Sequence, residues 1–204
     1  MRMGCTPGVV IRSGNGEPGV LNSRIYLIPT HMANLPMPHV WRPSVTVAAI
    51  IERDARFLLV EENTPQGLRI NQPAGHLEFG ESLLQAVIRE TLEETAHDFR
   101  PTALLGLYLL PTGPTAADTT YLRVAFVGEL GAEHPQRVLD VGIIRTLWLT
   151  RAQIADRADA MRSPLVLRCV DDYIAGQRAS LDTLYWHSAQ TDRGSDTQVS
   201  RARR

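Results

Sequence analysis

The sequence predicts an α+β fold, in which hairpin-like strands have helices packed on top of them. Three observations lead to this prediction. Short apolar runs recur along the chain between turn residues, as they do in antiparallel strands. One longer segment, 82–95, has the apolar spacing of a helix. Glycine, proline, asparagine and serine concentrate between these segments, where turns are expected.

The first half of the chain predicts two strands followed by a helix. The segments "SVTVAAII" (44–51) and "RFLLVEE" (56–62) are rich in β-branched and aliphatic residues, and "ERDA" between them is a turn. The segment "INQPAGHLE" (70–78) is interpreted as a short strand or a turn. A helix is predicted to begin at Ser82, because Ser82 and Gln85 have the spacing of a capping box.

The second half predicts three further strands. They are "ALLGLYLLP" (103–111), "TYLRVAFVGEL" (120–130) and "RTLWL" (145–149), and the loop 111–120 joins the first two. That loop is rich in proline, glycine and threonine, so it is expected to be irregular.

Two helices are predicted near the end of this part of the chain. Thr150 is expected to cap a short one. Ser163 and Pro164 fit an N-cap followed by proline at the first helical position, and Gly176 is the expected stop.

The composition describes a globular chain without a broad charged surface. It has 204 residues, a formal net charge of −1 and 44% hydrophobic residues. Binding to nucleic acid or to a membrane surface needs a basic excess, so neither partner is expected. No apolar run approaches the roughly 20 residues of a membrane-spanning helix. Cys5 and Cys169 lie far apart and form no CxxC motif, so a reducing, cytoplasmic setting is predicted.

The chain contains no lysine, and all 21 of its Lys and Arg residues are arginine. A P-loop lysine and a lysine Schiff base are therefore excluded. Any contacts to phosphate must come from arginine, from backbone N–H groups or from a metal ion.

The two ends differ in composition from the middle of the chain. Residues 1–36 are dense in glycine, proline and asparagine and show no sustained period, so they are interpreted as a flexible extension or as sequence upstream of a mis-assigned start. Residues 37–187 are the predicted domain. Residues 188–204 are polar and are predicted to be a disordered tail.

The helix 82–95 has an apolar sector that is expected to be buried. At 100° per residue this sector spans about 140°. It consists of Leu84, Val87, Ile88, Thr91 and Leu92.

Glu90, Glu93 and Glu94 occupy a different arc of about 100° on the opposite side of this helix. Glu90 and Glu94 are like charges at i,i+4, and their repulsion costs about a few tenths of a kcal/mol. Only Arg89, at i,i+4 to Glu93, offers a local opposite charge. One interpretation is a solvated acidic face, which is common in helices. The other is a cation site, because carboxylates at i, i+3 and i+4 can converge on Mg²⁺.

At these residues the sequence resembles the Nudix box, a loop–helix–loop signature written G-x5-E-x7-R-E-U-x-E-E-x-G-U. The matching positions are Gly75, Glu81, Arg89, Glu90, Glu93 and Glu94. Three positions depart from the signature: Thr91 replaces a larger aliphatic residue, and Ala96 and His97 replace the closing glycine and aliphatic residue. Because Ala96 replaces a glycine, the left-handed conformation that usually ends this helix is less favourable at position 96.

The resemblance implies a Nudix fold, that is, a mixed β-sheet packed between helices with a catalytic loop–helix–loop. It also implies an enzyme that hydrolyses phosphoric anhydrides with Mg²⁺ or Mn²⁺. The implied metal ligands are the carboxylates of Glu90, Glu93 and Glu94 and the backbone carbonyl of Ala74. The implied catalytic residues are Glu81, Arg89, Glu90 and Glu93, with Arg89 orienting the glutamates and Glu81 supporting the site from the loop.

The segments "NQPAGHLE", "LRVAFVGEL", "RSPLV" and "YIAGQR" are similar to the NudJ-type members of this superfamily. These members are associated with phosphate release from nucleoside tri- and diphosphates and from thiamine or hydroxymethylpyrimidine pyrophosphate. Arg123 and Arg162 lie in the matching segments and either contact substrate phosphates or form surface salt bridges.

Two alternatives stay open on the sequence alone. One is another Nudix activity, such as ADP-ribose hydrolysis, and the other is a Nudix-fold nucleotide-binding module without catalysis. The expected partner is a small diphosphate substrate, and the expected state is a monomer or a homodimer.

Overall fold

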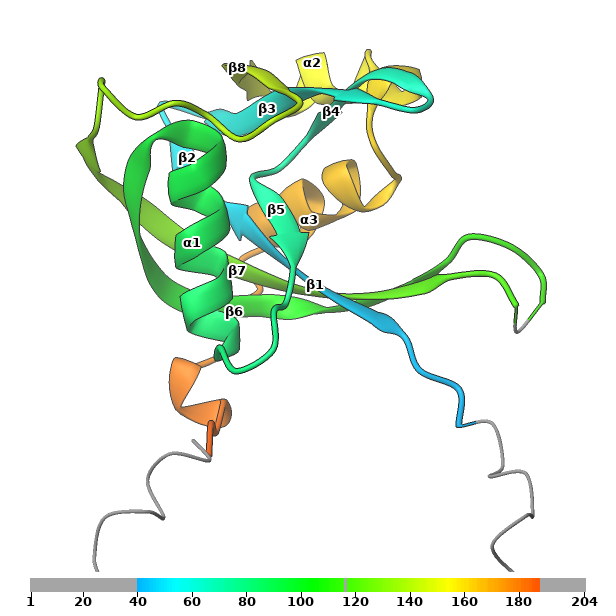
Figure 1. Ribbon diagram of the computed structural model, residues 1–204. Coiled ribbons are helices and arrows are strands. Elements are labelled where there is room, and N and C mark those ends of the chain that lie inside the picture. The colour runs from blue at the N-terminus through cyan, green and yellow to red at the C-terminus, as the bar shows by residue number, and fades with distance from the viewer. Residues whose placement is uncertain (1–39, 116, 188–204) are drawn as a thin grey trace, which may run out of the picture. The chain divides into compact units, whose positions relative to one another are not determined.

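The computed structural model describes residues 40–115 and 117–187 (Figure 1). The predictions made for residues 1–36 and 188–204 lie outside the described residues.

The described residues form strands and helices in a mixed order, as the α+β prediction requires. The strands are β1 (Ser44–Ile50), β2 (Glu52–Arg53), β3 (Arg56–Thr64), β4 (Gly67–Asn71), β5 (Ala74–His76), β6 (His97–Pro111), β7 (Thr120–Glu133) and β8 (Ile143–Thr150). The helices are α1 (Leu83–Thr95), α2 (Arg151–Ala155) and α3 (Leu165–Ile174), with 3₁₀ turns η2 (Ala158–Ala160) and η3 (Leu181–Thr183).

The strands form two four-stranded sheets, and each strand predicted from the sequence is present. The first sheet has the order β5-β1-β7-β6 and is mixed, because β1 and β7 run parallel while the other pairs are antiparallel. The second sheet contains β2, β3 and β4, with β8 paired to β3. The predicted loop 111–120 joins β6 to β7.

Helices cover both faces of the first sheet, which confirms the arrangement implied by the resemblance (Figure 1). Successive residues of β1 point to opposite faces. Val47 and Ala49 pack in one core cluster with residues of α1, whereas Ala48 and Ile50 pack in a second cluster with residues of α3. The sheet is therefore buried on both sides, which explains the unbroken apolar run of β1.

Some strand boundaries differ from the prediction. The strand β4 begins at Gly67, whose φ of +94° suits the hairpin turn after β3. The strand β6 begins at His97 rather than at position 103, because its polar first residues pair with the end of β7. Strand pairing is a tertiary effect, so the local sequence does not reveal this extension.

The predicted start of α1 is confirmed. Ser82 Oγ accepts the N–H of Gln85, and the Gln85 side chain accepts the N–H of Ser82, which completes the capping box. The helix ends in a left-handed residue despite the missing glycine, since Ala96 has φ 56° and ψ 28°. The N–H of Ala96 bonds to Leu92, and the N–H of His134 bonds to the Ala96 carbonyl, so this exit is held by hydrogen bonds.

The face of α1 that packs inward differs from the prediction. Val87 and Thr91 are buried as expected, but Ile88 is 39% exposed, whereas Glu90 and Glu94 are each only 8% exposed. The helix is thus turned so that two of its carboxylates are inside. Such burial is tolerable because these carboxylates have hydrogen-bond partners on β5 and on α1 itself.

The remaining helices are close to their predicted positions. Thr150 forms a capping box with Gln153 at the start of α2. The prediction for α3 was wrong by one residue: Pro164 occupies the N-cap and the helix starts at Leu165, because the Ser163 side chain caps Leu165 from one residue further back. Gly176, with φ +82°, ends this helix as predicted. No helix in the described ranges is long and apolar enough to cross a membrane.

Candidate active site

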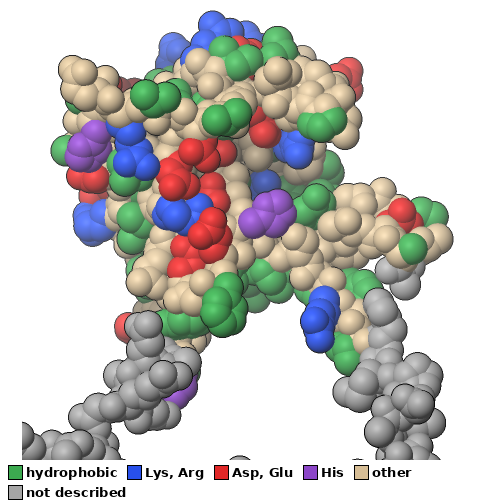
Figure 2. Space-filling model, in the orientation of Figure 1, with side chains coloured by type: hydrophobic (Ala, Val, Ile, Leu, Met, Phe, Trp, Pro, Cys, Tyr) green, Lys and Arg blue, Asp and Glu red, His purple; other side chains and the backbone are tan. Residues whose placement is uncertain are grey.

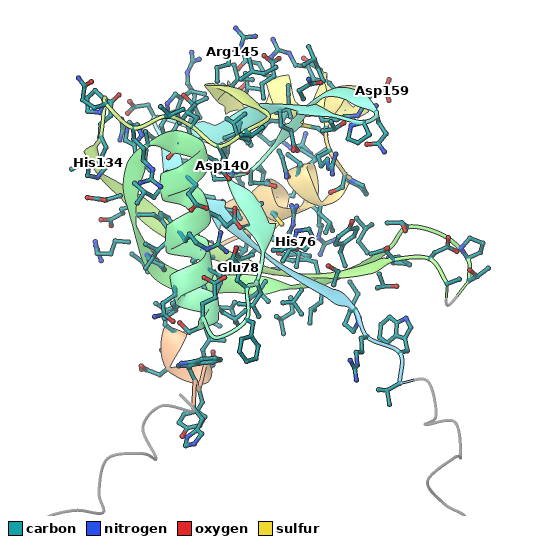
Figure 3. All side chains as sticks on the ribbon, viewed as in Figure 1. His76, Glu78, His134, Asp140, Arg145 and Asp159 are labelled. Atoms are coloured by element: carbon teal, nitrogen blue, oxygen red, sulfur yellow. The ribbon has the colours of Figure 1, made fainter. Side chains whose placement is uncertain are left out.

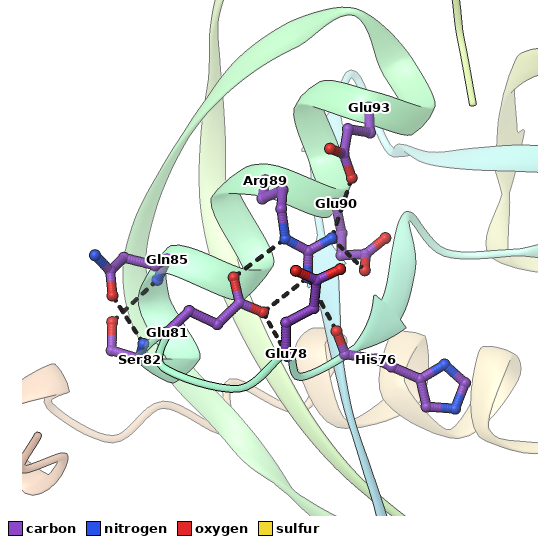
Figure 4. A network of polar contacts seen from close by, with 8 residues as sticks. All are labelled: His76, Glu78, Glu81, Ser82, Gln85, Arg89, Glu90 and Glu93. Atoms are coloured by element: carbon purple, nitrogen blue, oxygen red, sulfur yellow. Dashed lines mark hydrogen bonds and ion pairs between the residues drawn. The ribbon is translucent and has the colours of Figure 1, made fainter.

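Arg89 is the centre of the polar network on α1 (Figure 4). Its guanidinium donates to both carboxylate oxygens of Glu81, at 3.1 and 2.8 Å. The same group donates to Glu90 at 2.7 Å, to Glu93 at 3.1 Å and to the His76 carbonyl at 3.0 Å. Arginine presents its donors as a rigid planar fork, so one side chain fixes three carboxylates relative to the loop.

Glu81 holds this arginine from the loop before α1. The Oε1 atom of Glu81 also accepts the backbone N–H of Glu78, at 2.7 Å. The hydrogen bonds from Arg89 lower the pKa of Glu81, so this carboxylate remains charged and paired. The contacts match the supporting position that the resemblance implies for Glu81.

Glu94 is the most deeply placed of the three glutamates. Its Oε2 atom accepts the N–H of Ala74 on β5, at 2.9 Å. Burial raises the pKa of Glu94 to about 8, against the opposing effect of the Ala74 hydrogen bond. Neighbouring carboxylates, with Glu90 first among them, raise this pKa further. A bound cation would stabilise the charged form of a carboxylate that is buried beside other carboxylates.

Glu90 lies directly against the backbone of β5. A Cβ atom at position 75 would be 2.2 Å from the carboxyl carbon and from both oxygens of Glu90, so only glycine fits there. Burial raises the pKa of Glu90, and the hydrogen bond from Arg89 opposes that effect. Gly75 and Glu90 match separate positions of the signature, and in the structure the carboxylate of Glu90 fills the space that a side chain at position 75 would take.

The backbone of Ala74 faces the glutamates. In the antiparallel pair β1·β5, the N–H of Ala49 bonds to Pro73 and the N–H of Leu77 bonds to Val45. Ala74 lies between these positions and is a non-hydrogen-bonded residue of the ladder, so its N–H and C=O point away from β1. The N–H reaches Glu94, and the carbonyl is directed to the same side of the strand.

Two more carboxylates lie near this group, and sequence reasoning missed both. Glu62, at the end of β3, and Asp140, in the loop before β8, both act electrostatically on Glu94. The backbone N–H of Asp140 bonds to the Glu93 carbonyl at 3.0 Å, and Figure 3 shows Asp140 beside α1. Glu62 follows the buried run of β3, which is a weak local signal, whereas only the fold brings Asp140 here.

The donors gathered here are of the type that Mg²⁺ prefers, since all are carboxylate or carbonyl oxygens. One oxygen of Glu62 is buried without a hydrogen-bond partner among the described residues. Glu90 and Glu93 face Arg89, and no group of three or more His, Cys, Asp or Glu within 40–115 and 117–187 is close enough to hold a metal ion. The donor types fit a divalent cation, and the ligand roles of the glutamates stay a prediction.

A pocket of about 530 Å³ adjoins this group at β5. Figure 2 shows acidic side chains gathered along α1, with a basic side chain among them. Three arginines give the pocket a positive wall. Its lining residues include Glu62, Arg69, Asn71, Ala74, Gly75, His76, Tyr121, Arg123 and Arg162.

Both arginines singled out from the sequence line this pocket. Arg123 is only 7% exposed, so the expected alternative of a surface salt bridge is wrong for it. Arg162 lies at the rim, where its Nε is 3.8 Å from Glu62 Oε1, and its backbone N–H donates to Ile70. The pocket also contains Arg69, which the sequence reasoning did not single out.

The aromatic residue in the pocket is Tyr121, whose ring centroid is 6.2 Å from that of His76. Figure 3 shows His76 projecting from the strand β5. Together the site offers oxygen donors for a cation, arginines for phosphate and a ring surface.

The comparisons with known proteins agree on one family. A family model described as NUDIX domain matches residues 40–169. Curated relatives described as "Phosphatase NudJ" from Shigella boydii serotype 4 (strain Sb227) and from Escherichia coli (strain K12) are each 35% identical over 146 residues, which is 71% of this chain and 92% of the relative. A solved "NUDIX hydrolase from Nitrosomonas europaea" is 47% identical with a TM-score of 0.68, and the match covers 72% of this chain and 99% of that one.

Proposed function

We propose that this chain, which belongs to the Nudix family and is a hydrolase acting on phosphoric anhydrides, releases phosphate from small molecules that end in a diphosphate. Its substrates in this proposal are nucleoside tri- and diphosphates and thiamine or hydroxymethylpyrimidine pyrophosphate. The relatives described as phosphatases, each 35% identical over most of its length, support this choice of reaction.

One observation supports the proposal most directly: the carboxylates of α1 adjoin a pocket with three arginines. A diphosphate carries several negative charges, and neutralising them is the main task of an enzyme that transfers or hydrolyses phosphoryl groups. Arg69, Arg123 and Arg162 provide positive charge in the pocket. Ala74, which donates to Glu94, and Gly75, which lies against Glu90, line the same pocket.

In this proposal Glu90, Glu93, Glu94 and the Ala74 carbonyl hold Mg²⁺ or Mn²⁺. A bound divalent cation supplies charge for the diphosphate and lowers the pKa of water. Arg89 orients Glu90 and Glu93 from behind, and Glu81 fixes Arg89. One of the carboxylates accepts the proton of the attacking water, which is general base catalysis.

Two competing functions remain distinguishable by experiment. Hydrolysis of ADP-ribose would require the pocket to accept a second sugar beyond the diphosphate. A non-catalytic module would bind nucleotide without turnover, yet every carboxylate of the signature is present in this chain.

The test is a panel of purified substrates with Mg²⁺, read out as released phosphate and, for ADP-ribose, whose hydrolysis gives AMP and ribose 5-phosphate, as released AMP. The panel contains nucleoside tri- and diphosphates, thiamine pyrophosphate and ADP-ribose, and each is repeated with a chelator in place of Mg²⁺. Phosphate release from the first two groups that depends on the cation is expected. Turnover of ADP-ribose alone would contradict the proposed substrates, and binding without any turnover would favour the binding module.

The proposal places the hydrolase within residues 37–187 and in the cytoplasm, with no nucleic-acid partner. Cys169, the cysteine in the described part of the chain, is a buried free thiol, which agrees with a reducing setting. Removal of residues 1–36 is expected to leave the rate of phosphate release unchanged, and a loss of activity would contradict these domain limits.

A further inference from the structure

The segment "NQP" (71–73), which runs from the last residue of β4 to the start of β5, has no role in the function proposed so far. Its first two residues are polar but lie inside the protein: Asn71 is 7% exposed and Gln72 is 1% exposed. Buried amides need hydrogen-bond partners, and the identity of those partners indicates what the amides do.

Gln72 connects α3 to the buried arginine of the pocket. Its Nε2 donates to the Val166 carbonyl at 2.7 Å. This bond fixes which end of the amide faces inward, because only the nitrogen of an amide side chain can donate. The oxygen of Gln72 therefore faces Arg123 and accepts its Nη1 at 3.1 Å, while Asn71 Oδ1 accepts Nη2 at 3.3 Å.

These contacts leave the charge of Arg123 without a neutralising partner. A buried arginine is usually paired with a carboxylate. Arg123 instead has two neutral amide oxygens, and no carboxylate in the described residues forms an ion pair with it. The thiol of Cys169 also lies beside it, but burial raises the pKa of this thiol to about 11, so the thiol is neutral. Glu62 and Glu94 act on Arg123 only electrostatically. Burial lowers the pKa of Arg123 more than these neighbours raise it, which agrees with a charge that has no carboxylate partner.

We propose that Asn71 and Gln72 are positioning residues, which hold the Arg123 guanidinium at the pocket wall without neutralising it. The full charge of Arg123 then serves a phosphate group of the substrate. This inference rests on the proposed function for the identity of that substrate. A carboxylate in place of either amide would hold the guanidinium in the same position, but it would neutralise the positive charge of Arg123.

The first test is Asn71→Asp, which is nearly isosteric and gives Arg123 a carboxylate partner. The KM of the proposed substrate is expected to rise about tenfold, while kcat stays within about twofold. The urea midpoint is expected not to fall, because the buried charge gains a partner. Gln153→Glu is the matched control: it makes an amide acidic in the capping box of α2, where Glu is also favoured, and should keep the wild-type KM. A wild-type KM for Asn71→Asp would overturn the inference and leave a purely structural role.

The second test removes the hold on Arg123 without adding charge. Gln72→Met is made in the wild type and in Arg123→Met. If Gln72 acts through Arg123, it raises KM in the wild type and has no further effect once Arg123 is absent. Equal effects in both backgrounds would overturn the positioning role, and this test also decides the matter if Asn71→Asp does not fold.

Binding of inorganic pyrophosphate by calorimetry, with a chelator present, separates this inference from the proposed function. If the wild type hydrolyses nothing in the panel, but Asn71→Asp still weakens pyrophosphate binding about tenfold, the proposed function fails and the inference stands. If the wild type hydrolyses its substrates and Asn71→Asp keeps both the wild-type KM and the wild-type pyrophosphate affinity, the inference alone fails.

Discussion

Gly75 on β5 leaves the space that the carboxylate of Glu90 on α1 fills. A Cβ atom at position 75 would lie 2.2 Å from the Glu90 carboxyl group. Gly75→Ala is therefore expected to displace Glu90 and to lower kcat by about a hundredfold, the effect of an ångström of misplacement at a reacting centre. Gly75 does not have a positive φ, so its backbone accepts alanine. Steady-state kinetics and thermal unfolding check both statements.

Gly67→Ala is the matched control for this prediction. Gly67 has φ +94°, and a Cβ atom there would meet nothing within 4 Å. This variant is expected to lose about 1 kcal/mol of stability and to keep its kcat, which is the reverse pattern. A Gly75→Ala variant with wild-type kcat would show that the position of Glu90 does not matter for turnover.

Arg89→Lys tests whether the fork of the guanidinium is needed. Arg89 donates to both oxygens of Glu81 and also to Glu90 and Glu93, which one ammonium group cannot reproduce. The free energy of unfolding is expected to fall by about 1–3 kcal/mol, and kcat is expected to fall as well. Urea denaturation and steady-state kinetics measure the two effects.

The control is Arg100→Lys, at an exposed ion pair with Glu129. Exposed pairs contribute little, so this change is expected to alter stability by less than about 0.5 kcal/mol and to leave kcat unchanged. If Arg89→Lys and Arg100→Lys behave alike in both measurements, the network around Arg89 has no special importance.

The pH dependence of stability follows from Glu94. Its pKa in the folded, metal-free protein is raised to about 8 from an ordinary 4.5. Between these values the folded state binds more protons than the unfolded state, so the free energy of unfolding falls as the pH rises. Without metal, the urea concentration at the unfolding midpoint is expected to fall as the pH rises from about 5 to about 8. Mg²⁺ is expected to raise the midpoint more at pH 8 than at pH 6, because the cation competes with the proton.

Urea midpoints measured across this range, with chelator and with Mg²⁺, check this prediction. Glu94→Gln is the reference, because it cannot titrate and should reduce the slope. A midpoint without metal that rises from pH 5 to pH 8 would contradict the assignment of a buried, uncompensated carboxylate.

The sequence predicted the elements that local interactions determine. The capping box of Ser82 and Gln85 involves residues three apart, so the start of α1 was predicted correctly. The buried face of α1 was predicted less well, since the apolar period favours Ile88, which is exposed. The contacts that turn Glu94 inward come from β5, twenty residues away in the chain. A helical wheel does not contain that information.

The candidate site shows the same division. The resemblance identified Gly75, Glu81 and the α1 residues, and the structure brings them together. Glu62 and Asp140 were missed, because they reach the site from β3 and from the loop before β8. The charge state of Arg123 was also missed, because it depends on whether the partners supplied by the fold are amides or carboxylates.

Ala96 occupies a left-handed position that glycine adopts without strain. Ala96→Gly is expected to raise the free energy of unfolding by about 0.5–1 kcal/mol, because relief of the Cβ contact exceeds the greater entropy of unfolded glycine. Activity is expected to stay unchanged. Urea denaturation measures the effect, and a variant less stable than the wild type would show that Ala96 is not strained.

Glu94 is the residue that the proposed reaction with Mg²⁺ requires most. The most direct measurement is phosphate release from a nucleoside diphosphate and from thiamine pyrophosphate, with Mg²⁺, by the wild type and by Glu94→Gln. Glu129→Gln, at an exposed site, serves as the control. The account predicts a loss of at least about a hundredfold in Glu94→Gln with the fold intact, and no loss in the control. Phosphate release by Glu94→Gln at the wild-type rate would contradict it.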